Sequence, residues 1–370
     1  MKDFVTSLTR QFLPQLGPEE RRMALKELQR IIDENMFDLA LGGGDGEGDP
    51  RSCPRCECAH VVKRGRDASG SQRWLCRGCG RSFTSATNAV FATTKLDRDV
   101  WMRFAQCHID LLTLRESAER CGVSLKAAFF MRHRILEAVF RCIPSFRAQS
   151  GMGVEMDECY VPECFKGNRR NSECASIPRK PRKRTEPCDL RERICILTGI
   201  NDAGDIFYEI VGRGEMSERR ATEALSGRIG SGAIVATDGA NAYVKALKAQ
   251  DVRKHIATKA AEHGINRVNA LHSRLMEFLD EFHGVATRRL ANYLAWFKWI
   301  WSFKVGRSAE GMANLMVKQV ASSPYKTTWR AYKDTPYPFY DYWEKQAKWD
   351  EQARKALLLA RCSGRVSIAG

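Results

Sequence analysis

The spacing of apolar residues divides the chain into helical and strand-like segments. Apolar side chains recur at helical spacing in residues 8–37, and three further helical patterns lie between Asp97 and Phe146. From Gly153 the pattern changes to short apolar, β-branched runs, which are typical of strands. Four such runs read VEMDECYV, RICILTGI, IFYEIVGR and AIVATDG, and a helix is predicted between the third and the fourth. The predicted helices of this part of the chain are Ser217–Ile229, Tyr243–Lys248, Asn266–Phe282 and Arg288–Phe303.

This order of elements predicts several domains. Three consecutive strands, a crossover helix, a fourth strand and then further helices indicate a mixed α/β sheet. A chain of 370 residues is also too long for one ordinary domain. The glycine- and acid-rich run Gly42–Asp49 has nothing to pack and is predicted to be a linker. We predict a multidomain α+β protein with N-terminal helices (1–45), a cysteine-rich module (50–92), a helical domain (95–146), a mixed α/β domain (150–305) and a helical tail (306–370).

The charge balance changes this picture by indicating a partner. Lys and Arg number 60 against 44 Asp and Glu, so the formal net charge is +16. Such a surplus favours a polyanion, because each phosphate that a basic side chain neutralises releases a condensed counterion. A basic protein without such a partner is the alternative. Apolar residues make up 44% of the chain, which is enough to build cores and argues against wholesale disorder.

No stretch of the sequence predicts a membrane partner or an export signal. The apolar runs Ile206–Val211 and Ala295–Phe303 are far shorter than the roughly 20 residues that a membrane-spanning helix needs. The N-terminal residues MKDFVTSLTRQF lack the apolar core and cleavage site of a signal peptide. We therefore expect a cytoplasmic protein, in which most of the 14 cysteines are small buried apolar residues rather than disulfides.

Two cysteine pairs near the N-terminus have the spacing of a metal site. Cys53 and Cys56 form one CxxC knuckle, Cys76 and Cys79 form a second, and 19 residues separate the two. Each knuckle lets two thiolates bind one ion, and four thiolates complete a tetrahedral structural Zn²⁺ site. A redox pair, or replacement of one ligand by the nearby Cys58 or His60, is the alternative. Basic residues around the knuckles suit contact with phosphates: Lys63, Arg64, Arg66, Arg73, Arg77 and Arg81.

The helical domain has the pattern of a helix-turn-helix. Leu114–Arg120 is predicted to be one helix, Cys121–Val123 a turn, and Ser124 the N-cap of a second helix. In a helix-turn-helix the second helix enters the major groove of DNA. A plain three-helix packing unit is the alternative. The basic residues of the second helix are Lys126, Arg132, His133 and Arg134, and we predict DNA contacts from Lys126, Arg132 and Arg134.

Two aspartates in the predicted sheet are candidates for metal-dependent chemistry. Asp157 lies within a mostly apolar strand, where a carboxylate is costly unless it binds a metal or a partner. Asp238 ends the run AIVATDG, where a glycine lets the chain leave the sheet. On neighbouring strands, two such carboxylates would bind Mg²⁺ for phosphoryl transfer. Each alone has a plainer explanation, since Asp before Gly is ordinarily a turn residue.

A third ligand is expected from the helix predicted at Asn266–Phe282. Its apolar residues fall on one face, and at about 100° per residue Asn269 falls on the opposite face with His272 beside it. The apolar face would pack on the sheet and leave the Asn269 side near the metal. The alternative is that Asn269 is only an exposed helix residue. The apolar face comprises Leu271, Leu275, Phe278, Leu279 and Phe282.

From about Cys53 to Phe303 the chain resembles insertion-sequence transposases with an N-terminal zinc ribbon, the ISXO-type group of the DDE superfamily. The resemblance is carried by the two CxxC pairs and by longer segments that occur in the family's order. These segments are MDECYVPECFKGNRR, PRKPRKR, ATDGANAY, INRVNALHSRLMEFL and FHGVATRRLANYLAWF. The resemblance implies a zinc ribbon at 50–92, a helix-turn-helix at 95–146 and a ribonuclease-H-like catalytic domain at 150–305.

The resemblance also implies a catalytic triad of Asp, Asp and a third residue. The two aspartates match Asp157 and Asp238. In the branch that this chain looks closest to, the third residue is Asn, which falls on Asn269. In the branch that has Glu, the equivalent position is His272, which is not a usual magnesium ligand. The Asn branch usually has a Lys at the position of Met276, so the chain departs from the family there.

The basic segment after the first aspartate is predicted to contact DNA beside the active site, as similar loops in the family do. A solvated charged loop or a nuclear-localisation signal is the alternative. The residues are Arg179, Lys180, Arg182, Lys183 and Arg184. Late in the chain, Trp296, Trp299 and Trp301 are predicted to lie in a core or a subunit interface, with base stacking as the alternative.

Together these patterns predict a DNA transposase that binds terminal inverted repeats and performs magnesium-dependent nicking and strand transfer. Double-stranded DNA is the expected partner, and pairing two ends requires a homo-oligomer of at least two subunits. We expect a bacterial cytoplasmic protein that is nucleoid-associated when bound to DNA. Two alternatives stay open: a non-catalytic DNA-binding regulator or decayed transposase, and a nuclease of the same fold that does not transfer strands.

Overall fold

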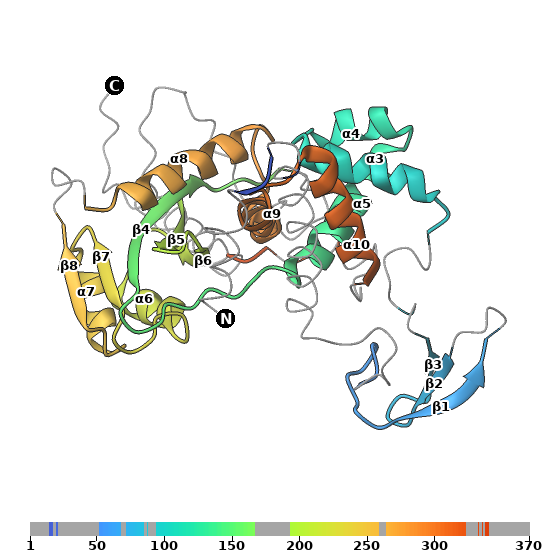
Figure 1. Cartoon of the computed structure of the whole chain (residues 1–370), viewed down its shortest axis with the longest axis horizontal. Helices are drawn as coiled ribbons and strands as arrows, with labels where there is room; N and C mark the ends of the chain where they lie inside the picture. The colour runs from blue at the N-terminus through green and yellow to red at the C-terminus, as the bar shows by residue number, and fades with distance from the viewer. Residues whose placement is uncertain are drawn as a thin grey trace, which may run out of the picture. The chain divides into compact units, whose positions relative to one another are not determined.

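The chain folds into two compact units in the computed structural model. One unit comprises Met1–Pro144 with Ala295–Trp329, and the other comprises Ser145–Leu294 with Arg330–Gly370. Each unit is described by itself below, with the element labels of Figure 1. The structure describes residues 15–17, 20, 52–67, 72–84, 87, 94–166, 193–258, 264–322, 332, 335 and 337–339. Within these residues, no helix is both long enough and apolar enough to cross a membrane.

The cysteine-rich module is a small antiparallel sheet of three strands. These are β1 (Val61–Arg66), β2 (Gln72–Cys76) and β3 (Ser82–Phe83), in the order β1-β2-β3. The buried side chains are Trp74 and Phe83, which are paired across β2 and β3, together with two of the cysteines. A core this small gives the module little apolar stabilisation of its own.

Three helices follow, as the apolar pattern predicts. They are α3 (Arg98–Ile109), α4 (Leu114–Cys121) and α5 (Leu125–Phe140). Thr113 and Glu116 form a capping box that starts α4. Gly122 ends that helix with a φ of 65°, in the left-handed region that glycine adopts without steric cost. Ser124 then accepts a hydrogen bond from the N–H of Ala127, so the predicted helix, turn and N-cap are present.

The late helices differ from the predicted domain boundaries. The predicted tail (306–370) contains α10 (Ala309–Ser322), which packs against α3 and α5 instead of forming a separate segment. The boundary between the units falls inside α9 (Leu290–Phe303). The second unit includes this helix only as far as Leu294, whereas the mixed α/β domain was predicted to end at residue 305. The apolar pattern predicted these helices but not their partners, because an amphipathic face shows that a helix is covered and not by what.

The second unit contains the predicted mixed sheet. Its strand order is β6-β5-β4-β7-β8, in which β4 and β6 are each antiparallel to β5, β7 is parallel to β4, and β8 is parallel to β7. The fifth strand, β8, was not predicted, because it is largely exposed and therefore lacks the apolar run that marks the equally short β7. The strands are β4 (Gly153–Pro162), β5 (Arg193–Asn201), β6 (Ile206–Arg213), β7 (Ile234–Thr237) and β8 (Lys254–Ala257).

Helices cover both faces of this sheet (Figure 1). On one face, α6 (Glu218–Leu225) and α7 (Asn241–Lys248) pack on an apolar core that includes Val154 and Met156 of β4. On the other face, α8 (Asn266–Asp280) packs against β4 and β5 and leads to a short 3-10 helix, Thr287–Arg289. Since successive strand residues point to opposite faces, the odd-numbered residues of β4 lie on the α8 side.

Candidate functional site

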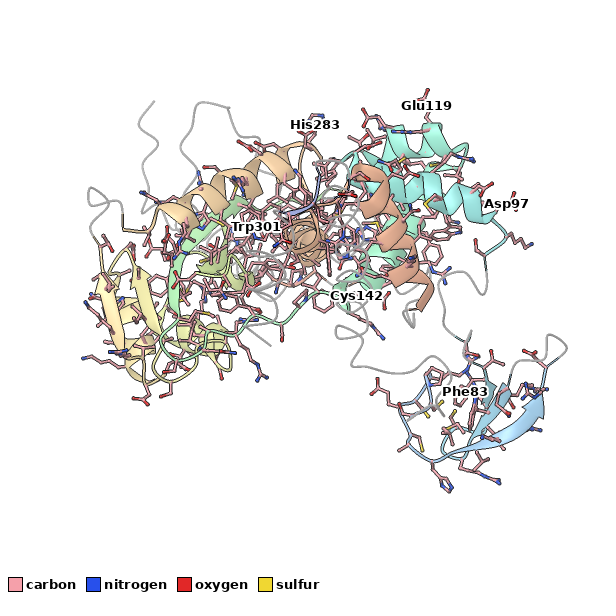
Figure 2. The ribbon with its side chains drawn as sticks, in the orientation of Figure 1. Phe83, Asp97, Glu119, Cys142, His283 and Trp301 are labelled. Atoms are coloured by element: carbon pink, nitrogen blue, oxygen red, sulfur yellow. The ribbon has the colours of Figure 1, made fainter. Side chains whose placement is uncertain are left out.

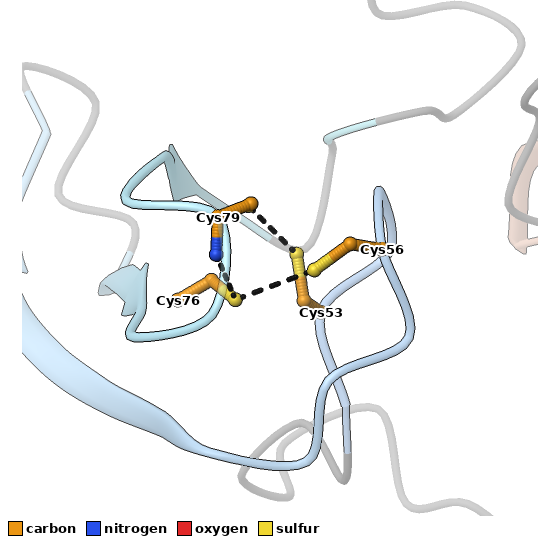
Figure 3. Close-up of side chains that lie close together, drawn as sticks. All are labelled: Cys53, Cys56, Cys76 and Cys79. Carbon is orange, nitrogen blue, oxygen red and sulfur yellow. Dashed lines mark hydrogen bonds between the residues drawn. The ribbon is translucent and has the colours of Figure 1, made fainter.

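The four knuckle cysteines come together at one point of the cysteine-rich module (Figure 3). One potential ligand atom from each lies within 4.8 Å of the others, and this is the only such group of three or more found among the described residues. The sulfur atoms of Cys53 and Cys79 are 3.8 Å apart, and those of Cys56 and Cys76 are 3.5 Å apart. Four sulfur ligands about 2.3 Å from a tetrahedral Zn²⁺ are themselves roughly 3.8 Å apart, so this geometry fits the ion.

Backbone N–H groups in the turns of the two knuckles donate to two of the sulfur atoms, and one of these bonds favours the thiolate form of Cys76. The N–H of Arg55 donates to the sulfur of Cys53, and the N–H of Cys79 donates to the sulfur of Cys76, both at 3.4 Å. The latter hydrogen bond lowers the pKa of Cys76 to about 6. The neighbouring Cys58 is not part of the cluster of four, although a Cβ added at Gly78 would lie only 2.9 Å from its sulfur.

The two predicted catalytic aspartates belong to neighbouring strands of the second unit's sheet, Asp157 within β4 and Asp238 directly after β7. Strands β4 and β7 are parallel, with Val154 paired to Val235 and Glu155 to Ala236. Continued by two residues, the same register brings Asp157 opposite Asp238, on the face that α8 covers. The charge of Asp238 contributes to the raised pKa of Asp157, as expected for neighbouring carboxylates.

Asp157 stands in an environment that disfavours its negative charge. Its side chain is only 19% exposed. Burial first, and then the charges of Glu158 and Asp238, raise the pKa of Asp157 to about 7, although a hydrogen bond from the backbone of Glu158 opposes this. Glu158 points to the other face of β4, where the hydroxyl of buried Tyr243 on α7 donates to it. A cation bound at Asp157 would offset this accumulation of negative charge.

Asp238 sits in a tight turn at the end of β7. Its Oδ1 accepts a hydrogen bond of 2.9 Å from the N–H of Ala240, and the intervening Gly239 has a φ of 84°. The preceding Thr237 lies 2.8 Å, hydroxyl oxygen to Nε2, from His255 of β8. Burial lowers the pKa of His255, and the charge of Asp238 opposes that shift. Sequence reasoning missed His255, because the strand that carries it was not predicted.

The third candidate residue next to the aspartates is His272. Its Nδ1 lies 4.0 Å from Oδ2 of Asp157, and its Nε2 lies 2.5 Å from the hydroxyl oxygen of Thr198 on β5. Burial lowers the pKa of His272 to about 4, so the ring is neutral at physiological pH. Asn269 is exposed near the start of α8, and its backbone carbonyl accepts a hydrogen bond from Ser273. Both residues were predicted from the helix pattern, and the structure brings His272 to the aspartate.

A carboxylate that the sequence did not single out attaches α8 to the sheet. Glu155, two residues before Asp157 on the same face of β4, accepts hydrogen bonds from the N–H groups of Arg267 and Val268 in the first turn of α8. The guanidinium of Arg267 bonds to Glu155 at 2.6 Å and to Asp202 at 3.0 Å. These bonds place the amino end of α8 over β4, which sets where His272 meets Asp157.

Two of the predicted DNA-binding residues are buried, so that part of the prediction was wrong. Arg132 and Arg134 are 1% and 4% exposed, and His133 is buried as well. The guanidinium of Arg132 donates to the carbonyl of Leu112 at 2.6 Å and to the hydroxyl of Ser117. The C-terminal half of α5 is therefore a core helix, and basic residues there do not reach a surface. Lys126, near the start of the same helix, is exposed.

The remaining predicted residues divide between core positions and positions outside the described part of the chain. Trp296 and Trp299 are fully buried, as predicted for core aromatics. Trp301, labelled in Figure 2, is half-buried, with its ring centroid 6.1 Å from that of Phe297. The predicted N-terminal helices (1–45) lie almost entirely outside the described residues. The basic segment lies wholly outside them: Arg179, Lys180, Arg182, Lys183 and Arg184.

Comparison with known proteins gives one informative relative. No protein-family model matches the chain. The chain is 26% identical over 254 residues to an uncharacterized protein in transposable element ISH50 of Halobacterium salinarum, covering 66% of this chain and 83% of the relative. This chain is a relative of a transposable-element protein. The relationship to insertion-sequence proteins that the motifs predicted is thereby confirmed.

Two solved structures were also found to be similar over part of their length. A chain of the simian T-cell lymphotropic virus intasome in complex with PP2A regulatory subunit B56 gamma aligns with a TM-score of 0.26 and 13% identity, over 54% of this chain and 67% of that one. A chain of a pre-cleavage Mos1 transpososome aligns with a TM-score of 0.20 and 12% identity, over 64% and 81%. The relationship to a transposable element rests on the sequence match.

Proposed function

We propose that this protein is a DNA transposase whose catalytic residues include Asp157 and Asp238. The observation that carries the proposal is the register of β4 and β7, which brings the two aspartates together on one face of the mixed sheet. The relative encoded in a transposable element supports the same class of reaction. The antiparallel first three strands, followed by parallel β7 and β8, support a ribonuclease-H-like catalytic domain.

The proposed chemistry is cleavage and rejoining of phosphodiester bonds. Asp157 and Asp238 would hold divalent ions such as Mg²⁺, which when bound would supply positive charge to the attacking and leaving oxygens of an in-line displacement. The buried position of Asp157 supports this role, because a charge at that position is costly until a cation offsets it. In the first reaction water attacks a phosphodiester at the end of the element and frees a 3′-hydroxyl. In the second, this hydroxyl attacks a phosphodiester of target DNA, forms the new bond and displaces the 3′-oxygen of the target strand.

DNA is the proposed substrate, and the N-terminal modules are the proposed means of recognising terminal repeats. The net charge of +16 favours a polyanionic partner. The cysteine-rich module is proposed to be a zinc ribbon, supported by the four converging thiols. The exposed start of α5, with Lys126, is the part of the helix-turn-helix that is available to DNA. Joining two ends requires at least two subunits on the DNA.

The test is cleavage of a labelled DNA end taken from the flanks of the gene, with Mg²⁺ or Mn²⁺. Asp157→Ala and Asp238→Ala are compared with wild type and with Asp280→Asn, which removes an exposed carboxylate from the far end of α8. We expect metal-dependent nicking that both alanine variants abolish while DNA binding and Asp280→Asn nicking are retained. Nicking that survives in both alanine variants would contradict the proposal.

A non-catalytic DNA-binding regulator, or a decayed transposase, is the second candidate. It is favoured by Asn269, a neutral residue at the third catalytic position, and by Met276, where the family usually has a Lys. Tight binding to the flanking DNA without nicking under either metal would support it. A nuclease of the same fold would nick the labelled end but would not join it to a second DNA. Short inverted repeats and a target duplication around the gene would favour a transposase over the non-catalytic protein and over the nuclease.

A further inference from the structure

The register of the strands separates the basic residues that the sequence places around the cysteine knuckles. Successive strand residues point to opposite faces of a sheet. Lys63 pairs with Trp74, a core residue beside the cysteines, so Lys63 lies on the face that carries the knuckle cysteines and the buried core. Its Nζ lies 5.5 Å from the centroid of the Trp74 ring. The neighbouring residues in sequence, Arg64 and Arg73, therefore lie on the opposite face.

This opposite face of the sheet is not part of the module's core. Among the described residues of the module, the buried core lies on the cysteine side. Val62 pairs with Leu75, and Leu75 pairs with Ser82, so one residue of each strand points away from the cysteines. Val62 and Leu75 are only partly buried. We call this surface the outer face, and it comprises Val62, Arg64, Arg73, Leu75 and Ser82.

Arg64 and Arg73 are cross-strand neighbours on the outer face. One residue beyond the pair of Lys63 and Trp74, at the start of an irregularity in β1, the register brings the two arginines opposite each other. Both side chains are exposed, and among the described residues neither guanidinium is paired with a carboxylate. Like charges directly opposite each other in a sheet are destabilising. An anion bound between the two guanidinium groups would offset this repulsion.

The guanidinium of Arg64 is oriented across the outer face. It donates a hydrogen bond of 3.0 Å to the hydroxyl oxygen of Ser82 on β3, although β2 lies between their strands. The Ser82 hydroxyl accepts this bond and keeps its own hydrogen for a further acceptor. Both charged residues of the outer face are cations, whereas the acidic residues described in the module, Glu57 and Asp67, lie in the first knuckle and after the end of β1. This charge distribution suits an anion with several acceptor oxygens, such as a phosphate.

We propose that the outer face is the surface of the cysteine-rich module that binds double-stranded DNA, with a backbone phosphate held between Arg64 and Arg73. The inference rests on the proposed function, which assigns DNA as the substrate, and it names where this module contacts the DNA. Arginine binds phosphate oxygens through two parallel charge-assisted hydrogen bonds, so two opposed guanidinium groups suit one phosphate. The apolar side chains of Val62 and Leu75 would pack against the adjacent sugars. Lys63, on the cysteine side, takes no part in this contact.

Salt-dependent binding of a labelled duplex from the flanks of the gene to the zinc-loaded full chain tests this assignment. Arg64→Gln, Arg73→Gln and the double variant are compared with Lys63→Gln, which removes one positive charge from the opposite face of β1. We expect each arginine variant to weaken binding roughly tenfold at fixed salt, as for a lost hydrogen bond to a charged group. The double variant should reduce the slope of log affinity against log salt by about one, for one lost phosphate contact. Lys63→Gln should retain the wild-type affinity and slope.

The zinc content of each variant shows whether the module is still folded, since a small module of this kind retains its ion only in the folded state. An equal loss of affinity in Lys63→Gln would overturn the proposal, because binding would then follow net charge rather than one face. Unchanged binding in the double variant would also overturn it, while nicking that depends on Asp157 would leave the transposase function standing. If the arginine variants weaken binding as expected but the wild type does not nick the duplex, the outer face stands and the transposase function fails.

Discussion

The cysteine cluster and the carboxylate pair are two candidate metal sites that the chain builds in different ways. The four cysteines lie within one short stretch, from Cys53 to Cys79, around a core that contains only Trp74 and Phe83 besides cysteine. The two aspartates, Asp157 and Asp238, are far apart in sequence and are brought together by a sheet covered with helices on both faces. We expect the first module to depend on a bound ion for stability, and we expect the sheet to support its carboxylates at an electrostatic cost that an ion would relieve.

The largest expected effect is the loss of the cysteine-rich module without zinc. A structural Zn²⁺ contributes about 10–16 kcal/mol of apparent binding free energy in zinc-finger peptides, which is more than a small core supplies. We expect Cys53→Ser to unfold this module and leave the sheet of the second unit intact. Hydrogen exchange measured by mass spectrometry would show full exchange of β1 and β2 with protection retained in β4 and β5.

Cys58→Ser is the matched control, because Cys58 lies beside the cluster without belonging to it. We expect that variant to keep the protection of β1 and β2. Unfolding in Cys58→Ser but not in Cys53→Ser would show that the ligand set was assigned wrongly. Protection of β1 and β2 after zinc removal would show that the contrast between the two sites does not hold.

The next effect concerns the loss in free energy of unfolding that ionised Asp157 causes in protein free of Mg²⁺ and Mn²⁺. Asp157 has a pKa of about 7 in the folded chain and an ordinary value of 3.8. Between these values the folded chain holds a proton that the unfolded chain has lost, so stability falls as the pH rises from about 4 to about 7. Asp157→Asn cannot ionise, and we expect it to be more stable than wild type at pH 8 by up to about 4 kcal/mol.

At about pH 4 the two proteins should unfold at nearly the same denaturant concentration, and chemical denaturation across the pH range measures the difference. Asp280→Asn, at the exposed end of α8, should follow the wild-type curve. If Asp157→Asn were less stable than the wild type at pH 8, the negative charge of Asp157 in the wild type would be compensated by other groups of the protein. The two metal sites would then be less different than we infer.

A smaller effect is expected where α8 is attached to the sheet. Glu155→Gln removes the charge that binds two backbone N–H groups and the Arg267 guanidinium. Hydrogen bonds to charged groups contribute about 1.5–3 kcal/mol, so we expect a loss of that order in the free energy of unfolding.

Glu277→Gln is the control, since Glu277 is exposed on the same helix. It should not change the free energy of unfolding, which chemical denaturation measures for both variants. A Glu155→Gln protein as stable as the wild type would show that these bonds contribute little to the attachment of α8.

The smallest effect concerns DNA contacts of the helical domain. Lys126→Ala should weaken binding to DNA and reduce the slope of log affinity against log salt by about one, as for one lost phosphate contact. Arg132→Met, in the core beside Trp296, should destabilise the fold without changing that slope. Salt-dependent binding titrations measure both, and an unchanged slope in Lys126→Ala would locate the DNA contact elsewhere.

The sequence predicted the parts of the molecule that depend on neighbouring residues. The CxxC knuckles, the capped α4, the turn at Gly122 and the strands β4 to β7 were all readable locally, because each follows from spacing, caps or β-branched runs. The apolar face of α8 was also correct, since a helical period needs no knowledge of the partner. The predicted pair came from Asp157 inside one strand, from Asp238 at the end of another and from the family pattern.

The tertiary structure alone decided which side chains meet. Arg132 and Arg134 look like surface cations in the sequence, but α4, α9 and α10 close around α5 and bury them. Asn269 and His272 are near neighbours on one helix, and only the bond between Glu155 and the start of α8 brings His272 rather than Asn269 to Asp157. The physical reason is range: spacing and caps act over a few residues, whereas burial and ligand geometry depend on contacts between residues that are distant along the chain.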